Sequence, residues 1–543
     1  MTAAKNNLLT RTQGMGAAAL ALGIGVLLSR VMGLVRDKII AYYFGTSAEA
    51  DIYFAAFTVP DFLNYLMAGG YFSVTLVPLL SAAFAEDEAD ARRFFSASVC
   101  WAALCIIVLT AAAWAAAPFI APFAAPGFAP EAHARLVFFL RIILPAQACF
   151  LPGACFTALL YCRRQFAVPA LTPLVYNGCI ILFGVLGWYC FPERGMEGFC
   201  WGVTAGAFSG ALCLPVLAVR AGGAVFAPCL LHPRMKQVFF LALPLMLGQS
   251  IVALDEQLVR VFGSLAGEGG VSLLSYARRI MQVPVGVVAQ AAGVASYPFL
   301  AALAARGERE RFAATLHSAA GNTLMVALPL TLWMQSAAGP IMRLIFRQGD
   351  FSAQAALDSG VLLSILLIGV PFWAVQQVAG RAFYAHRDTL TPALVGTTAA
   401  LAALPLYVFG ARYLGAAGVA GAGVAGVALY TLGICLRLRG KFGISALGTE
   451  GRKAAAALLC SLPAGICALG AQQGAAYLVD AAYSADAAES LLCAAVQTGF
   501  SAVVFASVYV LLARRFAPFL YAPLYGFAGR ARDKLLKKNQ RRH

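Results

Sequence analysis

Long apolar runs alternate with short polar segments along the whole chain. Run length read against turn-forming residues predicts fourteen membrane-spanning helices. Their expected ranges are 14–43, 49–84, 94–120, 132–161, 167–190, 196–219, 236–264, 269–304, 312–337, 354–385, 389–411, 414–436, 454–473 and 487–513. Runs of about 20 apolar residues cross a bilayer as helices, because a helix satisfies its own backbone hydrogen bonds. The pattern predicts an all-α polytopic membrane protein.

Composition agrees with this fold class. The 543 residues are 61% hydrophobic and only 12% charged, with a mean hydropathy of +0.78, whereas roughly a quarter of the residues in soluble domains are charged. A soluble domain is therefore excluded. The first apolar run is too long for a cleavable signal peptide, so we expect it to be the first membrane anchor.

The net charge of +16 reflects membrane topology rather than nucleic-acid binding. With the N-terminus inside, 27 of the 40 Lys and Arg residues fall in cytoplasmic segments and five in outer loops. This asymmetry follows the positive-inside rule and predicts that both termini are cytoplasmic. We therefore expect no nucleic-acid partner.

Cysteine and histidine are spread too thinly for a metal or redox site. The fourteen cysteines stand singly in apolar runs, and the five histidines are far apart in sequence. Neither a disulfide framework nor a zinc site is indicated. We expect no metal and no cofactor.

An internal repeat is visible at an offset of 223 residues. The residues 160–164 and 169–171 correspond to 383–387 and 392–394. The repeat predicts two homologous six-helix lobes, formed by helices 1–6 and 7–12, with two additional C-terminal helices. The expected divisions are an N-lobe at 1–225, a C-lobe at 226–440, helices 13 and 14 at 441–515, and a basic cytoplasmic tail at 516–543.

Charged residues inside the first two predicted helices require an explanation. The segment 29–73 contains Arg30, Arg36, Asp51 and Asp61, and each charge at a bilayer centre costs roughly 2.5–3.5 kcal/mol on insertion scales. Such residues normally face a polar cavity or a partner. We interpret the segment as lining a cavity for an anionic substrate, because guanidinium groups bind phosphate bidentately.

Spacing limits how these arginines act together. Arg30 and Arg36 lie six residues apart, so on a straight helix they point roughly 120° apart. A helix break at Gly33 would change this angle. The alternative is that Arg36, Asp37 and Lys38 form a local ion-paired cluster near a membrane face.

The second half supplies further charges on helices 7 and 8. Arg278 and Arg279 diverge by about 100° on a helix, and we expect Arg279 to face the cavity. Arg278 either shares the cavity or pairs with Asp255 or Glu256. The candidates for an ion-binding or gating role are Asp255, Glu256 and Arg260.

Asp51 has two interpretations. It is a partner or gate for an arginine of the cavity, or it belongs to a helix N-terminus, since Thr46, Ser47 and Glu49 come just before it.

Four motifs resemble the MurJ (MviN) lipid II flippases of the MOP exporter superfamily. They are SRVMGLVRD at 29–37, EADIYFAAFTVPDFL at 49–63, LIFRQGDFS at 344–352 and GRAFYAHRDTLTP at 380–392. The resemblance implies a monomeric, non-enzymatic transporter of the bacterial inner membrane. It implies that the substrate is lipid II, the undecaprenyl-pyrophosphate-linked peptidoglycan precursor. The transporter, surrounded by membrane lipids, would move lipid II to the outer leaflet by alternating access. In that family, helices 13 and 14 help to form a groove for the lipid tail.

The resemblance also assigns roles by position. Arg30, Arg36, Asp51 and Arg279 match family residues of the cationic cavity. Charged family positions are occupied here by Thr58, Asn64, Tyr65 and Gly69. Arg278 stands where the family has an aspartate, and it would replace the lost positive charge.

Energy coupling and two alternative functions stay open. Sodium coupling through helices 7 and 11 is disfavoured because 390–412 contains no acid, which leaves the membrane potential or another monovalent ion. Another MOP-type exporter, either a lipid-linked oligosaccharide flippase or a multidrug antiporter, is the nearest alternative. The second alternative is a membrane-embedded transferase, which would need clustered carboxylates for a metal ion or a general base.

Overall fold

The computed structural model describes residues 15–67, 69–223, 226–241, 254–482 and 491–520. These residues form helices and loops with no strand among them, which confirms the all-α class. Within the described ranges, nine helices are long and apolar enough to cross a membrane, or ten if one bent pair counts as a single span. The total of fourteen stays a prediction.

The chain divides into two compact units. The first comprises Met1–Ser275, Gln348–Phe351 and Leu404–Val419, and the second comprises the remainder. The division falls within the predicted eighth helix, so helix 7 belongs to the first unit. The expected division at 225/226 stays a prediction.

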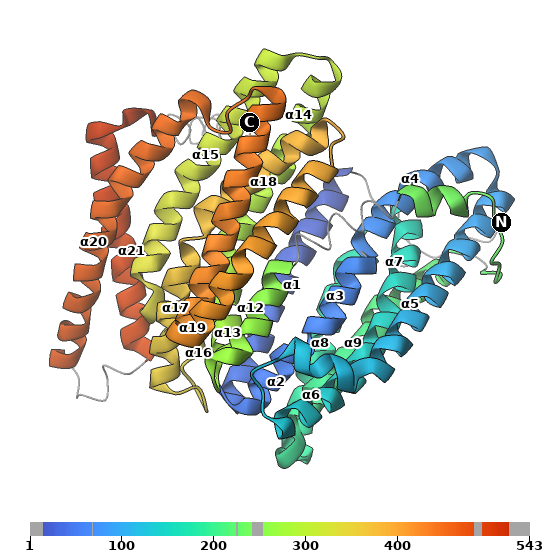
Figure 1. The fold of residues 1–543 in the computed structure, drawn as a ribbon, viewed down its shortest axis with the longest axis horizontal. Helices are drawn as coiled ribbons and strands as arrows, with labels where there is room; N and C mark the ends of the chain where they lie inside the picture. Colours follow the sequence, from blue (N-terminus) through green and yellow to red (C-terminus); the bar gives the residue numbers. More distant parts are fainter. Residues whose placement is uncertain (1–14, 68, 224–225, 242–253, 483–490, 521–543) are drawn as a thin grey trace, which may run out of the picture. The chain divides into compact units, whose positions relative to one another are not determined.

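Helices of the first unit follow the predicted spans closely (Figure 1). They are α1 (Met15–Phe44), α2 (Ala48–Ala56), α3 (Thr58–Met67), α4 (Gly69–Glu86), α5 (Glu88–Ala124), α6 (Pro130–Ile143), α7 (Gln147–Cys162), α8 (Ala167–Cys190), α9 (Gly195–Gly206), α10 (Leu214–Ala221) and α12 (Leu254–Gly263). Short helices η1 (Leu144–Ala146) and η2 (Pro192–Arg194) join them, and the π-helix η3 (Ala207–Cys213) continues α9. The predicted second span is thus three consecutive helices, α2 to α4. An apolar core lies among α4, α5 and α7.

The second unit continues the series. Its helices are the larger part of α13 (Gly270–Pro284), the π-helix η5 (Val285–Gln290), α14 (Ala291–Ala305), α15 (Arg309–Ser336), α16 (Ala338–Phe346), α17 (Ala353–Leu367), α18 (Val370–Ala385), most of α19 (Leu390–Phe442), α20 (Gly451–Ala482) and α21 (Leu491–Phe516). The α16 helix bends 71° away from α15 and was not expected from the sequence. Helices α20 and α21 pack together, and α20 also packs on α15.

The long α19 contains two helices. Gly415 has φ 57° and ψ −139°, a conformation outside the helical region. A Cβ on Gly418 would lie 2.0 Å from the carbonyl oxygen of Gly410. The two arms therefore approach backbone to backbone at glycines. The break separates the predicted helices 11 and 12.

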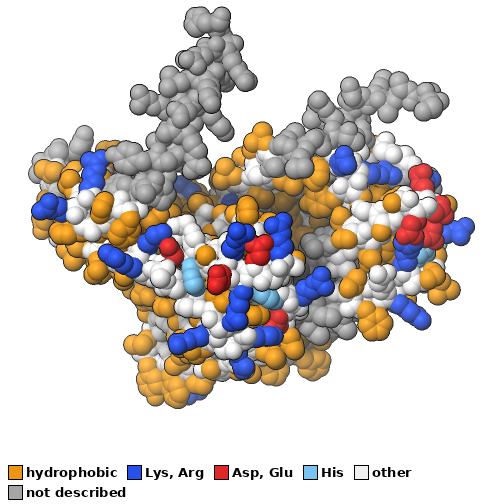
Figure 2. All heavy atoms as spheres, turned by 90° about the horizontal axis from the view of Figure 1, so that it is seen from above, with side chains coloured by type: hydrophobic (Ala, Val, Ile, Leu, Met, Phe, Trp, Pro, Cys, Tyr) orange, Lys and Arg blue, Asp and Glu red, His pale blue; other side chains and the backbone are white. Residues whose placement is uncertain are grey.

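Apolar side chains cover much of the surface (Figure 2). Phe119 and Phe123 on α5 are 78% and 80% exposed, for example. Exposed apolar area of this extent is what a lipid-facing surface requires. Lys, Arg, Asp and Glu gather in patches on the face that Figure 2 shows.

Two loops at equivalent positions of the sequence repeat have the same backbone geometry. Arg164 and Arg387 have φ of 57° and 60°, and they are the two non-glycine residues with positive φ in the described ranges. Each donates its backbone N–H to a carbonyl three residues earlier, that of Tyr161 or Tyr384, at 3.0 Å. A bulky residue rarely adopts this conformation, so the match supports the repeat.

In the second of these loops, Asp388 binds residues at both ends of α19. Its carboxylate accepts hydrogen bonds from the Thr391 hydroxyl at 2.7 Å and from Lys441 Nζ at 2.6 Å. Partial burial favours the neutral acid, but the hydrogen bonds from Lys441 and Thr391 outweigh burial and lower the pKa of Asp388.

We expect these contacts of Asp388 to fail in acid. A group with a lowered pKa in the folded state stabilises the fold above its unfolded pKa, about 3.9 for aspartate. That stability is lost as the pH falls through the lower folded pKa. The thermal unfolding midpoint in detergent at pH 6 and at decreasing pH measures the effect, and Asp388→Asn should show a smaller pH dependence than the parent protein. An equal pH dependence in the two proteins would contradict the assignment.

Candidate functional site

Arg36 is held in place by two neighbours within the first unit. Its Nε and Nη2 donate to Asp37 Oδ1 at 2.9 and 2.8 Å, and its Nη1 donates to Asn177 Oδ1 on α8 at 3.3 Å. The Arg36 side chain is 13% exposed and that of Asp37 2%. The ion pair expected between these two residues is therefore present. Because guanidinium has five N–H groups, two of them have no hydrogen-bond partner in the described part of the chain.

Arg30 occupies a different face of α1. Its side chain is exposed, whereas that of Arg36 is largely covered. The α1 helix is continuous from Met15 to Phe44, so the break considered at Gly33 is absent. Without that break the two guanidinium groups do not align, as the six-residue spacing predicts for a straight helix.

Asp51 supports a turn, and its partners are backbone groups rather than an arginine. Its Oδ2 accepts from the Gly269 N–H and its Oδ1 from the Ser272 N–H, both at 2.7 Å. These groups lie at the start of α13, where backbone N–H groups have no partner within the helix. Asp51 is 2% exposed. Asp51 lies in the first turn of α2, as the helix N-terminal interpretation expected, but the helix start whose N–H groups it binds is that of α13. Its role as a partner or gate for an arginine stays a prediction.

Arg260 joins two acids within the first unit. It donates to Asp61 on α3 at 2.6 Å and to Glu256, one turn earlier on α12, at 2.8 Å. Asp61 thus has an arginine of helix 7 as its partner. The gating role of Glu256 and Arg260 stays a prediction. Asp255 lies on α12, but its side chain is outside the described residues.

The paired arginines lie on α13 in the second unit. Arg278 is buried and Arg279 is partly exposed. Their different burial agrees with the expected divergence of adjacent helix positions. The roles expected for them in substrate binding stay predictions.

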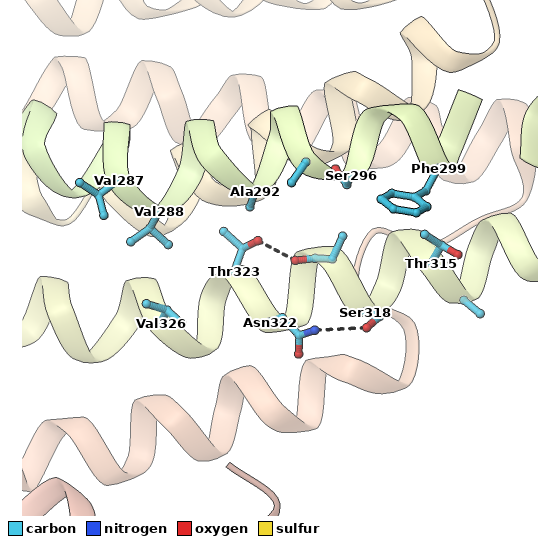
Figure 3. A pocket seen from close by; sticks show the side chains of 13 residues that line it. Val287, Val288, Ala292, Ser296, Phe299, Thr315, Ser318, Asn322, Thr323 and Val326 are labelled. Carbon is cyan, nitrogen blue, oxygen red and sulfur yellow. Dashed lines mark hydrogen bonds between the residues drawn. The ribbon is translucent and has the colours of Figure 1, made fainter. Parts of the chain in front are cut away.

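An apolar cavity of about 850 Å³ lies within the second unit, between η5–α14 and α15. Figure 3 shows Val287 and Phe299 on one wall and Val326 on the other. The opposite wall also carries polar groups, with Asn322 Nδ2 donating to Ser318 Oγ at 3.3 Å. The size lies in the range of about 300–1,000 Å³ that is common for ligand sites. Its chemistry suits an apolar chain.

Sequence reasoning missed Asn177. Asn177 is a polar residue within the apolar run 167–190. Its position among apolar residues was the only sign in the sequence that it has a polar partner. Its contact with Arg36 joins residues 141 positions apart. Sequence alone offers no way to find such a partner before the packing of α1 on α8 is known.

Solved structures share this fold. A structure titled "Lipid II flippase MurJ, inward closed conformation" has a TM-score of 0.74 at 21% identity, covering 91% of this chain and 99% of the other. An inward-facing multidrug resistance MATE family transporter of the MOP superfamily has a TM-score of 0.64 at 16% identity, covering 78% of this chain and 98% of the other. The fold is therefore one that transporters of the MOP superfamily share.

Sequence comparison gives the family. A family model for the lipid II flippase MurJ matches residues 40–481. A probable lipid II flippase MurJ from Rhizobium meliloti is 32% identical over 373 residues, which are 67% of this chain and 69% of the relative. The chain belongs to the lipid II flippase MurJ family, as the four sequence motifs predicted.

Proposed function

We propose that this protein moves lipid II from the cytoplasmic to the outer leaflet of the bacterial inner membrane. The observation that carries the proposal is the family match over residues 40–481. The related protein of Rhizobium meliloti is itself described as a probable lipid II flippase. The family is one of transporters, and we propose that this chain likewise catalyses no covalent reaction.

Arg36 is the residue best prepared to bind the pyrophosphate. Asp37 and Asn177 fix its guanidinium through three N–H groups, and two N–H groups are left for a ligand. Charge-assisted hydrogen bonds from arginine to phosphate are strong and geometrically specific. Pre-orientation lowers the entropic cost of capture. We expect Arg30, Arg278 and Arg279 to add positive charge during transport.

Asp51 has a supporting role in this mechanism. Both of its oxygens are committed to the start of α13. Asp51 therefore acts by fixing the turn before α13, the helix that carries Arg278 and Arg279, and not by contacting substrate.

The apolar part of the substrate fits the cavity between α14 and α15. Its walls are largely aliphatic and aromatic, and burying each CH₂ group contributes about 0.8 kcal/mol. An isoprenoid tail can pack against these aliphatic and aromatic side chains. The energy source is a separate matter: we propose that the membrane potential or a monovalent ion drives transport. One charge crossing 100 mV supplies about 2.3 kcal/mol.

A depletion-rescue experiment tests the function. A strain depleted of its own lipid II flippase should grow when it expresses this chain, and lipid II should become accessible at the outer face. A lipid-linked oligosaccharide flippase would restore neither. Failure of rescue with normal amounts of the protein in the membrane would overturn the proposal.

The same assay compares the two arginines of α13. We expect Arg278→Ala to impair rescue nearly as much as Arg279→Ala, because Arg278 replaces a positive charge that this chain lacks on helix 2. Arg381→Ala on α18 is the matched control, since Arg381 lies over the rings of Tyr297 and Tyr384. Normal growth with Arg278→Ala at unchanged protein level would show that Arg278 has no part in binding.

A further inference from the structure

A second apolar groove, of about 870 Å³, lies within the first unit. It is bounded by α8, by α9 with η3, and by the corner at η1 and α7. We call it the α8–α9 groove. Trp201 and Phe208 on its walls are 54% and 57% exposed, and Phe183 and Leu186 are 42% and 52% exposed. It shares no residue with the Arg36 site or with the cavity between α14 and α15.

The groove results from close contact between the two helix backbones. Glycines recur every fourth residue along α9 and η3, where an added Cβ would lie within 3.0 Å of the α8 backbone; they are Gly198, Gly202, Gly206 and Gly210. Small residues at this spacing let helices approach without intervening side chains. The large side chains are consequently displaced outward, where they line the groove. The π-helix η3, a type of irregularity frequent at functional sites, positions Phe208.

One cation and one anion lie at the end of the groove where α9 begins. Arg194 is exposed, and although its backbone N–H donates to the Phe191 carbonyl at 2.9 Å, its guanidinium has no hydrogen bond or ion pair with another described residue. Glu197 is partly covered, and its Oε1 accepts from Arg135 Nη1 at 2.7 Å. Its Oε2 has no hydrogen-bond partner among the described residues. The mouth thus offers a free donor group and a free acceptor oxygen.

The remaining charges near the mouth argue against a purely anionic ligand. Arg135 is shared between Glu197 and Glu49, and the exposed Glu193 precedes Arg194. The five groups together carry one more negative than positive charge. A ligand with a positive and a negative group side by side matches this arrangement better than an anion does.

We propose that the α8–α9 groove binds a zwitterionic phospholipid with a primary ammonium group, of the phosphatidylethanolamine type. Arg194 binds the phosphate, Glu197 Oε2 accepts a hydrogen bond from the ammonium group, and one acyl chain lies along the apolar walls. From Gly195 to Phe208 a helix rises about 20 Å. This is enough to follow a chain through one leaflet, half of a hydrocarbon core of about 30 Å.

The head group distinguishes this lipid from its relatives. A quaternary ammonium group, as in phosphatidylcholine, cannot donate a hydrogen bond to Glu197. Phosphatidylglycerol supplies no positive group at all. Binding of this phospholipid does not depend on lipid II transport, because the groove itself would retain the lipid in any membrane protein.

Native mass spectrometry of the purified full chain tests the proposal. The protein is exposed to equal amounts of phosphatidylethanolamine, phosphatidylcholine and phosphatidylglycerol, and the lipids that stay bound are counted. We expect one phosphatidylethanolamine to be retained in preference. Arg194→Gln should weaken its binding about tenfold, since a hydrogen bond to a charged group is lost. Ala205→Phe, which fills the groove, should abolish it.

A matched variant makes the result specific. Arg412→Gln removes an exposed arginine elsewhere in the first unit and should not change retention. Preferred retention of phosphatidylglycerol, or equal retention of phosphatidylcholine, would overturn the head-group assignment. Unchanged retention in Arg194→Gln and Ala205→Phe, each with a normal unfolding midpoint, would overturn the site.

Discussion

Arg36→Leu is expected to abolish rescue of a flippase-depleted strain. The variant removes the guanidinium that Asp37 and Asn177 hold for the pyrophosphate. Loss of the oriented, charge-assisted hydrogen bonds should weaken substrate binding at least tenfold. Arg36→Lys keeps the charge but not the planar donor fork, so we expect only partial rescue from it.

Two controls separate binding from folding. Arg36→Leu leaves the buried carboxylate of Asp37 without its arginine, which alone destabilises a protein. The double variant Arg36→Leu with Asp37→Asn also removes that buried charge, and rescue should still fail. Arg141→Leu removes an exposed arginine that lies over the Trp114 ring on a helix of the same unit, and it should rescue growth. Restored growth in the double variant would show that Arg36 has only a structural role.

Arg260→Leu is expected to destabilise the first unit by about 3–5 kcal/mol. The substitution leaves Asp61 and Glu256 as neighbouring carboxylates without the cation between them. The side chains of Arg260, Asp61 and Glu256 are each no more than 30% exposed, so water compensates poorly. The thermal unfolding midpoint in detergent and the yield of monodisperse protein measure the loss.

An exposed pair of the same spacing gives the comparison. Arg92 and Glu88 form an i,i+4 ion pair with side chains 47% and 68% exposed, and such pairs contribute less than about 1 kcal/mol. Arg92→Leu should therefore change stability little. The triple variant Arg260→Leu, Asp61→Asn, Glu256→Gln should recover most of the loss. Equal effects of Arg92→Leu and Arg260→Leu would contradict the role of burial.

Helix positions were largely predictable from the sequence because hydrophobicity and chain length decide them locally. The run 167–190 coincides with α8, for example. The ion pair between Arg36 and Asp37 was also predictable, since the two residues are adjacent. The end of the span at Ala337 was predicted as well, but the short helix α16 after it was not, because nine residues are too few to be recognised as a membrane span.

The partners of the buried charges were not predictable, because they are set by packing between distant segments. Asp51 is separated by more than two hundred residues from Gly269 and Ser272, whose backbone N–H groups donate to its carboxylate. Charge complementarity suggested an arginine as its partner. Backbone N–H groups at the start of α13 are an equally good match for a carboxylate, and the sequence contains no sign of where that helix start lies in space.

The matched loops at Arg164 and Arg387 bear on how the chain arose. Their backbones agree in an unusual conformation, while the side chain that follows each arginine differs, with Gln165 in one loop and Asp388 in the other. We infer that the loop geometry dates from a gene duplication and that the two copies then diverged in chemistry. The ion pair from Asp388 to Lys441 is then a point at which the two halves differ, since the equivalent position of the first half is Gln165. Introducing aspartate and lysine at the equivalent positions of the other half would test whether that half can form the same ion pair.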